Sequence, residues 1–463
     1  MQELLLKIVS TFNQYLTNYV LIILLVGIGL YFTIRTRFVQ VRCFGEGMRR
    51  VFGGIKLKGE KHGNSGMSSF QALATAIAAQ VGTGNIVGAC GAILLGGPGA
   101  IFWMWVIAFF GMATIYAEAT LAQKTKVYTE DGEVLGGPAY YIRAAFHGKV
   151  GKLLAGFFSV ACILALGFMG GMVQSNSIGE AFHNAFHIPA WVCGIAVAAM
   201  AGLIFLGGIQ RIASVTEKIV PVMASLYIVG CLVLLVMNLK AVPEAFALIF
   251  KYAFQPQAII AGGFGYAIKE AISQGAKRGL FSNEAGMGST PHAHAVAKVD
   301  KPHDQGVSAM VGVFIDTFIV LTLTALVVIT VFYTKGGSLS EFAAVDGSGI
   351  TKTNMAQLAF SSTFGSVIGK SFVAICLFFF AFSTIIGWYF FGKQNAVALF
   401  GKKSVIPFTV ISIAFVVLGS FLSNDLVWEL TDAFNYLMVI PNVLALFMLG
   451  GTVASFAKNK NQK

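Results

Sequence analysis

Apolar stretches of about twenty residues recur along the whole chain, and this repetition constrains the fold more than any other feature of the sequence. Each stretch is long enough to cross, as a helix, a hydrocarbon layer roughly 30 Å thick. Hydrophobic residues make up 56% of the 463 positions and charged residues 11%, whereas soluble domains carry roughly 25% charge. A helix satisfies its own backbone hydrogen bonds in lipid. The sequence therefore predicts an all-α polytopic membrane protein.

Hydropathy and length predict about eleven spans in a single transmembrane domain that covers residues 1–463. They are centred in residues 19–34, 69–95, 101–122, 153–178, 190–206, 219–237, 259–297, 307–332, 367–391, 406–422 and 426–451. The apolar run at 19–34 is expected to be a retained first helix. No small-residue cleavage pattern follows it, and its basic flank lies on the C-terminal side.

The net charge of +12 is carried by loops, and its distribution predicts the orientation. The loop after the first span contains Arg35, Arg37, Arg42, Arg49, Arg50, Lys56, Lys58 and Lys61. The positive-inside rule places this loop in the cytoplasm. Later basic loops then also fall inside, so we expect the N-terminus outside and the C-terminus in the cytoplasm. One stretch disagrees, because Lys269, Glu270, Lys277 and Arg278 fall in the outer half of the seventh span.

No pattern for a transition metal, a nucleotide or an enzyme's catalytic group is apparent in the sequence. The six cysteines are scattered, five of them in apolar runs, and are interpreted as packing residues, with a disulfide as the alternative. His292, His294 and His303 gather near a predicted cytoplasmic loop, but no acid or cysteine completes a zinc set there. No phosphate-binding loop and no Ser/His/Asp arrangement is present. We expect no cofactor and no covalent chemistry.

Two predicted spans are interrupted by glycine and polar residues at membrane depth. Gln80-Val81-Gly82-Thr83-Gly84-Asn85 interrupts the second span, and Phe281-Ser282-Asn283-Glu284-Ala285-Gly286-Met287-Gly288 interrupts the seventh. Each glycine weakens a helix by about 1 kcal/mol. Non-helical backbone survives in a bilayer only where it is buried in protein or lines a wet cavity. The alternative is close helix packing through small residues.

The positions of the two interruptions predict an inverted repeat. They open the first and sixth of the last ten spans, as expected for two halves of five helices. The accessory helix would cover 17–36, the first repeat 67–240 and the second repeat 255–452. Amides beyond each break suit a carboxylate, and free carbonyls suit a cation or an ammonium group. A zwitterionic amino acid together with Na⁺ fits both. A channel would instead need a continuous polar stripe along several helices.

Three motifs carry a resemblance to a known family. They are Gly82-Thr83-Gly84-Asn85, Gly96-Gly97-Pro98-Gly99-Ala100-Ile101-Phe102-Trp103-Met104-Trp105 and Gly279-Leu280-Phe281-Ser282-Asn283-Glu284-Ala285-Gly286. Together they resemble the alanine or glycine:cation symporter family of the leucine-transporter-type superfamily, over nearly the whole chain. The resemblance implies alternating-access uptake of alanine, glycine or a close relative, driven by Na⁺ or sometimes H⁺. It implies a bacterial or archaeal plasma membrane, no nucleic acid and no obligatory protein partner.

The resemblance assigns one end of the substrate site to the first break. The backbone of Thr83 and Gly84 and the side chain of Asn85 would hold the substrate carboxylate, with Gln80 nearby. From the second break, Phe281 would cover the substrate.

The resemblance assigns the other end to the second break and the ninth span. The carbonyls around Ser282 and the side chains of Asn283 and Glu284 would face the amine or the cation. Thr384 and Trp388 are four residues apart, hence on one helix face, and Trp388 resembles a floor that limits side-chain size.

A sodium site is also implied by the resemblance. Its ligands would be the carbonyls of Ala78, Val81 and Phe380 with the hydroxyls of Ser383 and Thr384. Hard oxygen ligands of this kind are what an alkali cation requires.

Three further polar residues lie inside predicted spans. Asp316, like Glu284, is a candidate for coupling to the cation or to a proton, because a charge is costly to bury in a membrane. A structural hydrogen bond is the alternative for Asp316. Gln174 is either a pocket residue or part of an interhelical hydrogen bond, and Glu118 is expected to snorkel or to pack between helices.

Overall fold

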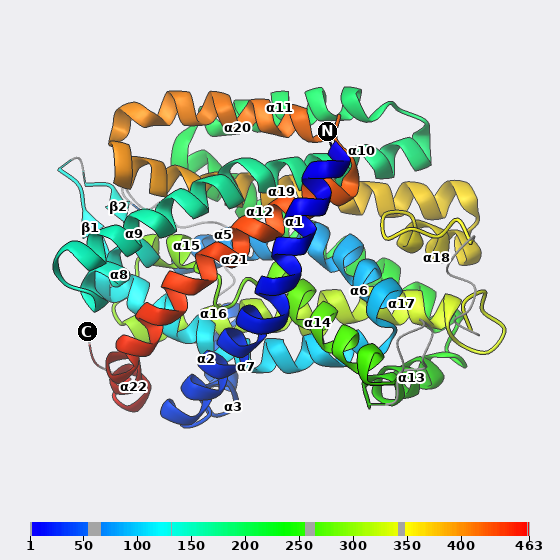
Figure 1. Ribbon diagram of the computed structural model, residues 1–463, viewed down its shortest axis with the longest axis horizontal. Coiled ribbons are helices and arrows are strands. Elements are labelled where there is room, and N and C mark those ends of the chain that lie inside the picture. Colours follow the sequence, from blue (N-terminus) through cyan, green and yellow to red (C-terminus); the bar gives the residue numbers. More distant parts are fainter. Residues whose placement is uncertain are drawn as a thin grey trace.

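Almost all regular structure in the protein is helical, as the sequence predicts (Figure 1). The computed structural model describes residues 2–53, 66–130, 132–254, 264–340, 348–460 and 462. The start of the predicted seventh span, residues 259–263, lies outside the described residues, as do Lys56, Lys58 and Lys61.

The chain begins with one long helical stretch that starts earlier than predicted. α1 (Gln2–Tyr15), the π-helical turn η1 (Leu16–Leu21) and α2 (Ile22–Arg35) together run for 34 residues. Two short helices follow, α3 (Val39–Arg42) and α4 (Phe44–Phe52). α1 lies alongside α21 (Asn424–Met448) across the centre of the view (Figure 1).

The next part of the chain holds the first interrupted helix. Its elements are α5 (Ser69–Gln80), η2 (Gly84–Gly88), α6 (Ala89–Gly96), α7 (Gly99–Thr125), β1 (Val127–Tyr128), β2 (Val134–Leu135), α8 (Pro138–Ala145), α9 (Gly148–Cys162), η3 (Ile163–Met169), α10 (Gly170–Phe186), α11 (Ala190–Phe205), α12 (Gly208–Met237) and α13 (Val242–Phe254). The two strands pair antiparallel, with Val127 opposite Leu135.

The last part of the chain holds the second interrupted helix. Its elements are α14 (Phe264–Asn283), α15 (Pro291–Val296), α16 (Pro302–Val313), η4 (Phe314–Leu321), α17 (Thr322–Phe332), α18 (Met355–Phe364), α19 (Ser366–Phe400), η5 (Lys402–Ser404), α20 (Val405–Gly419), α21 and α22 (Gly450–Lys458). α19 packs on α10 and α18, and α16 and α14 pack on α7. α19 is central, since Phe380, Trp388 and Phe391 on it are fully buried.

Each predicted span contains a helix, but not every one meets the criteria for crossing a membrane. Within the described residues eight helices are long and apolar enough, or nine if the bent pair Ser69–Gln80 and Gly84–Gly96 forms one span. α11 is shorter, at 16 residues, and α14 carries Lys277 and Arg278. The total of eleven and the division at 67–240 and 255–452 stay predictions.

The predicted cytoplasmic loops are joined by contacts at one end of the bundle. The β-hairpin, α8 and the C-terminus lie on the same side of the view (Figure 1). Lys402 Nζ lies 3.5 Å from Glu133 Oε2, and Lys460 Nζ lies 2.6 Å from Glu46 Oε2. The loop that holds Glu133 therefore meets the loop that holds Lys402, and α4 meets the C-terminal segment, while the side of the membrane that they face stays a prediction.

Candidate functional site

The first of the two interrupted helices is broken at residues 81–83, between α5 and η2. A capping box of Ser68 and Gln71 starts α5, and the helix axis bends by 46° at the break. Gly82 N–H donates to Asn85 Oδ1 at 3.0 Å, and Thr83 N–H donates to Gln174 Oε1 at 3.3 Å. Side chains thus replace helical partners for the freed amides. Gly84 and Asn85, expected to be unwound, already belong to the helix beyond the break.

The second interruption begins later than the sequence predicted. Phe281 to Asn283 remain helical, and non-helical backbone runs over residues 284–290. Glu284, Gly286 and Gly288 have φ values of +58°, +89° and +83°. This left-handed region is costly for residues other than glycine, so Glu284 carries strain that its surroundings must hold.

The two breaks lie against each other. Gln80 Nε2 donates to the carbonyl of Asn283 at 2.7 Å. A Cβ built on Gly84 would lie 3.0 Å from Phe281 Cδ1 and 3.2 Å from Ser282 Cα. A side chain at position 84 would push these neighbours away, so glycine favours this close approach. The two interruptions are therefore neighbours in space, while a substrate site between them stays a prediction.

Asp316 on η4 connects, through its carboxylate, the helical residues next to the two breaks. Asn85 Nδ2 donates to Asp316 Oδ1 at 2.6 Å, and Ser282 Oγ donates to Asp316 Oδ2 at 2.9 Å. Thr317 Oγ1 donates to Oδ2 at 2.8 Å. Both amide atoms of the Asn85 side chain are therefore engaged with the protein. Its role toward a substrate carboxylate stays a prediction.

Oxygen atoms of the predicted cation site converge between α5 and α19. Thr384 Oγ1 donates to the carbonyl of Ala78 at 2.9 Å and to that of Phe380 at 3.1 Å. Ser383 Oγ donates to the same two carbonyls at 3.3 and 2.9 Å. Val81, the fifth predicted ligand, follows the last residue of α5. A Cβ on Gly82 would meet Thr384 Oγ1 at 2.4 Å, so glycine is required there.

Trp388 contacts Glu284, a pairing that the sequence did not predict. Trp388 Nε1 donates to Glu284 Oε1 at 2.5 Å, and Ser289 Oγ donates to the other carboxylate oxygen. The indole packs edge-on against Phe281, with ring centroids 5.6 Å apart. A Cβ on Gly170 would lie 2.2 Å from the indole. Trp388 and Phe281 thus form adjoining aromatic walls beside the second break.

Several buried polar atoms at the first break have no hydrogen-bond partner among the described residues. They include Gln80 Oε1, Thr83 Oγ1 and Gln174 Nε2. The three side chains are at most 2% exposed. Buried polar groups are normally bonded, so such a group calls for an explanation. The interhelical hydrogen bond expected of Gln174 is present, since its Oε1 accepts from the break, while its role in a pocket stays a prediction.

Charged and aromatic side chains form a layer over Phe281. The Phe281 and Trp428 rings lie 4.5 Å apart, and the Arg278 guanidinium lies 4.6 Å from the Trp428 ring. Asp432 lies 3.2 Å from Arg278 and 3.1 Å from Lys277. These contacts explain the charges in the outer half of the seventh span. Sequence reasoning missed Trp428 and Asp432, whose positions carry no motif.

A cavity of about 310 Å³ lies beyond this layer. It is lined by Leu6, Ser10, Val87, Gly88, Gly91, Leu95, Gln274, Lys277, Arg278, Lys352, Asp425, Trp428 and Glu429. Burial lowers the pKa of Lys352 in the loop before α18, although the ion pair with Asp425 at 2.7 Å opposes this effect. Lys277, Arg278 and Trp428 of this layer thus line the cavity, whereas no residue of 81–83 or 284–290 does.

The expectation that Glu118 snorkels is wrong, whereas helix packing is confirmed. Glu118 is fully buried and accepts Gly286 N–H at 3.1 Å. Asn442 Nδ2 donates to Glu118 at 2.7 Å and to the Gly286 carbonyl at 3.0 Å. The carboxylate is held inward because it satisfies the non-helical backbone. Asn442 has no sequence signal, since it lies far along the chain on α21.

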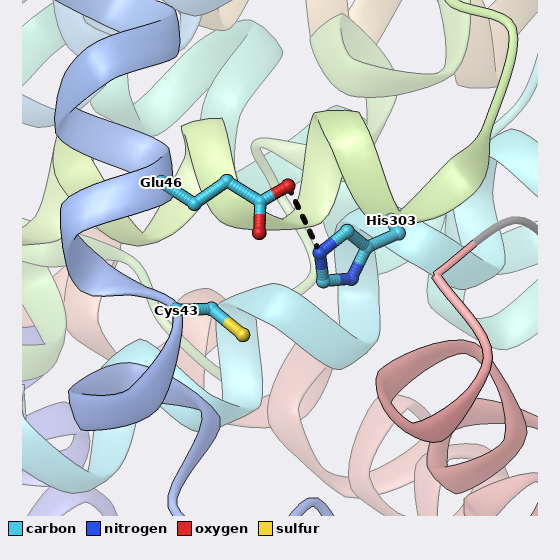
Figure 2. Close-up of side chains that lie close together, drawn as sticks. All are labelled: Cys43, Glu46 and His303. Atoms are coloured by element: carbon cyan, nitrogen blue, oxygen red, sulfur yellow. Dashed lines mark ion pairs between the residues drawn. The ribbon is translucent and has the colours of Figure 1, made fainter.

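The remaining cysteine and histidine expectations have mixed outcomes. All six cysteines are buried and free, which confirms their interpretation as packing residues. His292 contacts Asn395, and His294 contacts Gln305. His303, however, lies beside Cys43 and Glu46, so an acid and a cysteine do approach one of the three histidines (Figure 2). These two partners are distant in sequence and were therefore not predicted.

The chain matches known proteins over its whole length. Residues 1–463 match the model of the sodium:alanine symporter family. The sodium/alanine symporter AgcS of Methanococcus maripaludis is 38% identical over 459 residues, which cover 98% of this chain and 97% of that protein. An uncharacterized transporter of Haemophilus influenzae is 41% identical over 458 residues, 99% of this chain and 96% of that protein.

Two further likenesses bear on the substrate and on the fold. The probable sodium/glutamine symporter GlnT of Bacillus subtilis is 38% identical over 462 residues, 99% of this chain and 91% of that protein. The crystal structure of MhsT in complex with L-phenylalanine superposes with a TM-score of 0.56 at 14% identity, covering 86% of this chain and 100% of that one. At this identity the second likeness concerns the fold alone.

Proposed function

The chain belongs to the sodium:alanine symporter family, and from this premise we propose that it couples inward Na⁺ movement to uptake of alanine or glycine by alternating access. The protein is a multi-pass membrane transporter and not an enzyme. Its expected location is a bacterial or archaeal plasma membrane, with the N-terminus outside.

One observation carries the proposal of a small polar substrate at the breaks. Gln80 Oε1, Thr83 Oγ1 and Gln174 Nε2 are buried without partners among the described residues, beside a helix start. Amides in the first turn of a helix lack intrahelical acceptors and carry partial positive charge. A carboxylate bound at Thr83 and Gly84 would accept from these groups and from Gln174. The substrate carboxylate would thus supply partners for Thr83 Oγ1 and Gln174 Nε2.

The second break supplies the opposite charge and limits the size of the side chain. Glu284 and Asp316 are buried carboxylates; Asp316 accepts from Ser282 Oγ, and the next residue, Thr317, accepts from the side chain of Asn283. An ammonium group placed there would be attracted to them. Trp388 and Phe281 would leave room for a methyl group but not for a leucine side chain.

The oxygen cluster of Ala78, Val81, Phe380, Ser383 and Thr384 is the proposed Na⁺ site. In the present arrangement the two hydroxyls donate their protons to the carbonyls. A sodium ion would replace these bonds by turning the hydroxyl oxygens toward itself. The ion would then bind α5 to α19 and fix the helix that carries the first break, so ion binding would favour substrate binding.

Proton coupling is the second candidate, because Asp316 and Glu284 are carboxylates buried at membrane depth. Asp316 bonds to both breaks, so its protonation would loosen Asn85 and Ser282 together. We propose Na⁺ as the driving ion and retain Asp316 and Glu284 as positions through which either cation could act.

Uptake in proteoliposomes tests the proposal. Labelled alanine is offered with an inward Na⁺ gradient at fixed pH, with a pH gradient and no Na⁺, and with neither. Accumulation driven by Na⁺ alone is expected, together with counterflow that a channel would not show. Accumulation only with the pH gradient would assign coupling to protons, and no accumulation of alanine or glycine in any condition would refute the proposed substrate.

Substrate size is tested by replacing the aromatic wall. Trp388→Ala is expected to let leucine compete with labelled alanine, because the indole no longer fills the space beside Phe281. Trp191→Ala on α11, a position half exposed at the bundle surface, is the matched control and should keep the wild-type competition profile. A Trp388→Ala protein that still excludes leucine and binds alanine normally would contradict the proposal that Trp388 limits the size of the substrate side chain.

A further inference from the structure

A cysteine and a glutamate that are neighbours in the chain meet a histidine from a distant segment near the C-terminal tail (Figure 2). Cys43 directly precedes α4, Glu46 lies in the first turn of that helix, and His303 lies in the first turn of α16. One ligand atom from each residue lies within 4.8 Å of the other two. Glu46 Oε1 and His303 Nε2 are 3.5 Å apart. The three side chains point toward one common space.

His303 is oriented toward this space and has an unused nitrogen. The side chain is 1% exposed, and its Nε2 has no hydrogen-bond partner among the described residues. Its Nδ1 lies 2.7 Å from the hydroxyl of Tyr116. Metal-binding histidines commonly have the second ring nitrogen held by such an outer group, which fixes the ring. The open nitrogen therefore faces the thiol and the carboxylate.

We propose that Cys43, Glu46 and His303 bind a divalent transition metal of the zinc class, with a fourth position open to water. Thiolate, imidazole and carboxylate are the three ligand types that zinc takes from proteins. Sulfur and nitrogen ligands also favour such ions over Mg²⁺ or Na⁺. Closing the ligand atoms onto one ion requires shifts of about 1 Å at typical zinc distances. The sequence predicted no transition metal because His303 lies far along the chain from Cys43 and Glu46.

Lys460 supplies the positive charge at this site in the present arrangement. Its Nζ donates to Glu46 Oε2 at 2.6 Å. The second Glu46 carboxylate oxygen, Oε1, lies 3.5 Å from His303 Nε2. Arg50 lies closer to Asp304, at 2.7 Å, than to Glu46, at 3.4 Å. Arg50 therefore need not leave when a metal binds.

A bound metal and Lys460 would compete for Glu46. Lys460 follows the last helix, α22, and its side chain is 42% exposed, so the ammonium can move into water. Metal binding would then release the tail from α4. Binding of a transition metal would thus change the position of the C-terminal segment. This effect would be separate from binding of the transported ion between α5 and α19.

Cobalt binding to the purified full chain tests the proposal. The protein is reduced, stripped with a chelator and titrated with Co²⁺, whose thiolate complex absorbs light strongly. One Co²⁺ per chain and a thiolate band that Zn²⁺ removes are expected. Cys43→Ser should abolish the band, and His303→Gln should weaken binding by at least about tenfold. Lys460→Ala should strengthen binding by about tenfold, because a competing charge-assisted hydrogen bond is lost.

Matched controls separate this site from the other thiols. Cys193→Ser on α11 should retain the band and the wild-type affinity. No band in the wild type, or a band that survives Cys43→Ser, would overturn the proposal. If Cys43→Ser does not purify as a folded protein, alkylation of Cys43 in the wild type is followed by mass spectrometry. Zn²⁺ is then expected to slow labelling of Cys43 but not of Cys193, and equal labelling rates would equally refute the site.

Discussion

The first break, residues 81–83, leaves polar side-chain atoms without partners, whereas at the second break, residues 284–290, neighbouring helices take up most of the polar groups. Val81 and Thr83 keep negative φ values of −79° and −59°. The second break is longer and contains three left-handed residues, with Glu284 the one that is not glycine.

The difference indicates that the two interruptions have different roles, although their sequences are similar. Around the second break, Glu118 and Asn442 bond to the backbone at Gly286, and Trp388 and Ser289 hold Glu284. Thr290 Oγ1 is an exception without a partner among the described residues. Substitutions at the first break should therefore change ligand binding, while substitutions around the second should first change stability. The following predictions test this contrast.

The largest effect is expected for Gly82→Ala at the first break. The added Cβ would lie 2.4 Å from Thr384 Oγ1, between the break and the proposed Na⁺ site. Overpacking of this kind costs about 1–3 kcal/mol, which corresponds to a loss of up to about 100-fold in uptake. Na⁺-driven alanine uptake is the measurement. Gly156→Ala on α9 is the control, because its added Cβ meets nothing within 4 Å. If Gly82→Ala shows wild-type uptake, the close contact between residue 82 and Thr384 is not needed for transport.

A loss of stability is expected for Asn442→Leu at the second break. The substitution leaves Glu118 and the Gly286 carbonyl buried with one partner fewer, at a cost of about 1–3 kcal/mol each. Thermal unfolding in detergent, followed by cysteine-reactive fluorescence, should shift to lower temperature. Asn184→Leu, at a half-buried position on α10, is the comparison. If uptake is impaired while the unfolding temperature is unchanged, Asn442 serves transport and not the stability of the fold at the second break.

A binding defect without loss of stability is expected for Thr83→Val. The Thr83 hydroxyl has no partner among the described residues, and valine has nearly the same shape. If the hydroxyl donates to the substrate carboxylate, the KM for alanine should rise about tenfold or more, since hydrogen bonds to charged groups contribute about 1.5–3 kcal/mol. Uptake kinetics and the unfolding temperature are measured on the same preparation. A lower unfolding temperature with an unchanged KM would assign the hydroxyl to the fold.

The smallest effect is expected for Asp425→Asn, outside both breaks. Asp425 pairs with Lys352 at the edge of the cavity that Trp428 lines, and the Asp425 side chain is 69% exposed. Exposed ion pairs contribute about 0.2–1 kcal/mol, so uptake should change less than about fivefold. The change should shrink further at high salt, because exposed charges are screened. A larger, salt-independent loss would extend the functional site beyond the Phe281–Trp428 layer.

Sequence reasoning placed the helices and the two interruptions, but it misplaced some of their limits. The second break was expected from Phe281, yet α14 continues to Asn283, because the left-handed backbone begins at Glu284. Glu118 was expected either to snorkel or to pack between helices, and only the structure shows that it is bonded inward to Gly286. The contacts Trp388–Glu284 and His303–Glu46 were not predicted at all. Each of these pairs joins residues whose spacing in the chain carries no periodic signal.

The sequence by itself determined the membrane class, the family and the place where backbone would be freed. Apolar length, glycine spacing and loop charge are local properties, and each acts through the solvent or the backbone near its own position. Only the tertiary structure decided which side chain satisfies which freed group. Gln174, Asp316 and Asn442 reach the breaks because of how α10, η4 and α21 are packed and rotated about their axes. A rotation of one helix by a single residue would send any of these side chains to a different neighbour.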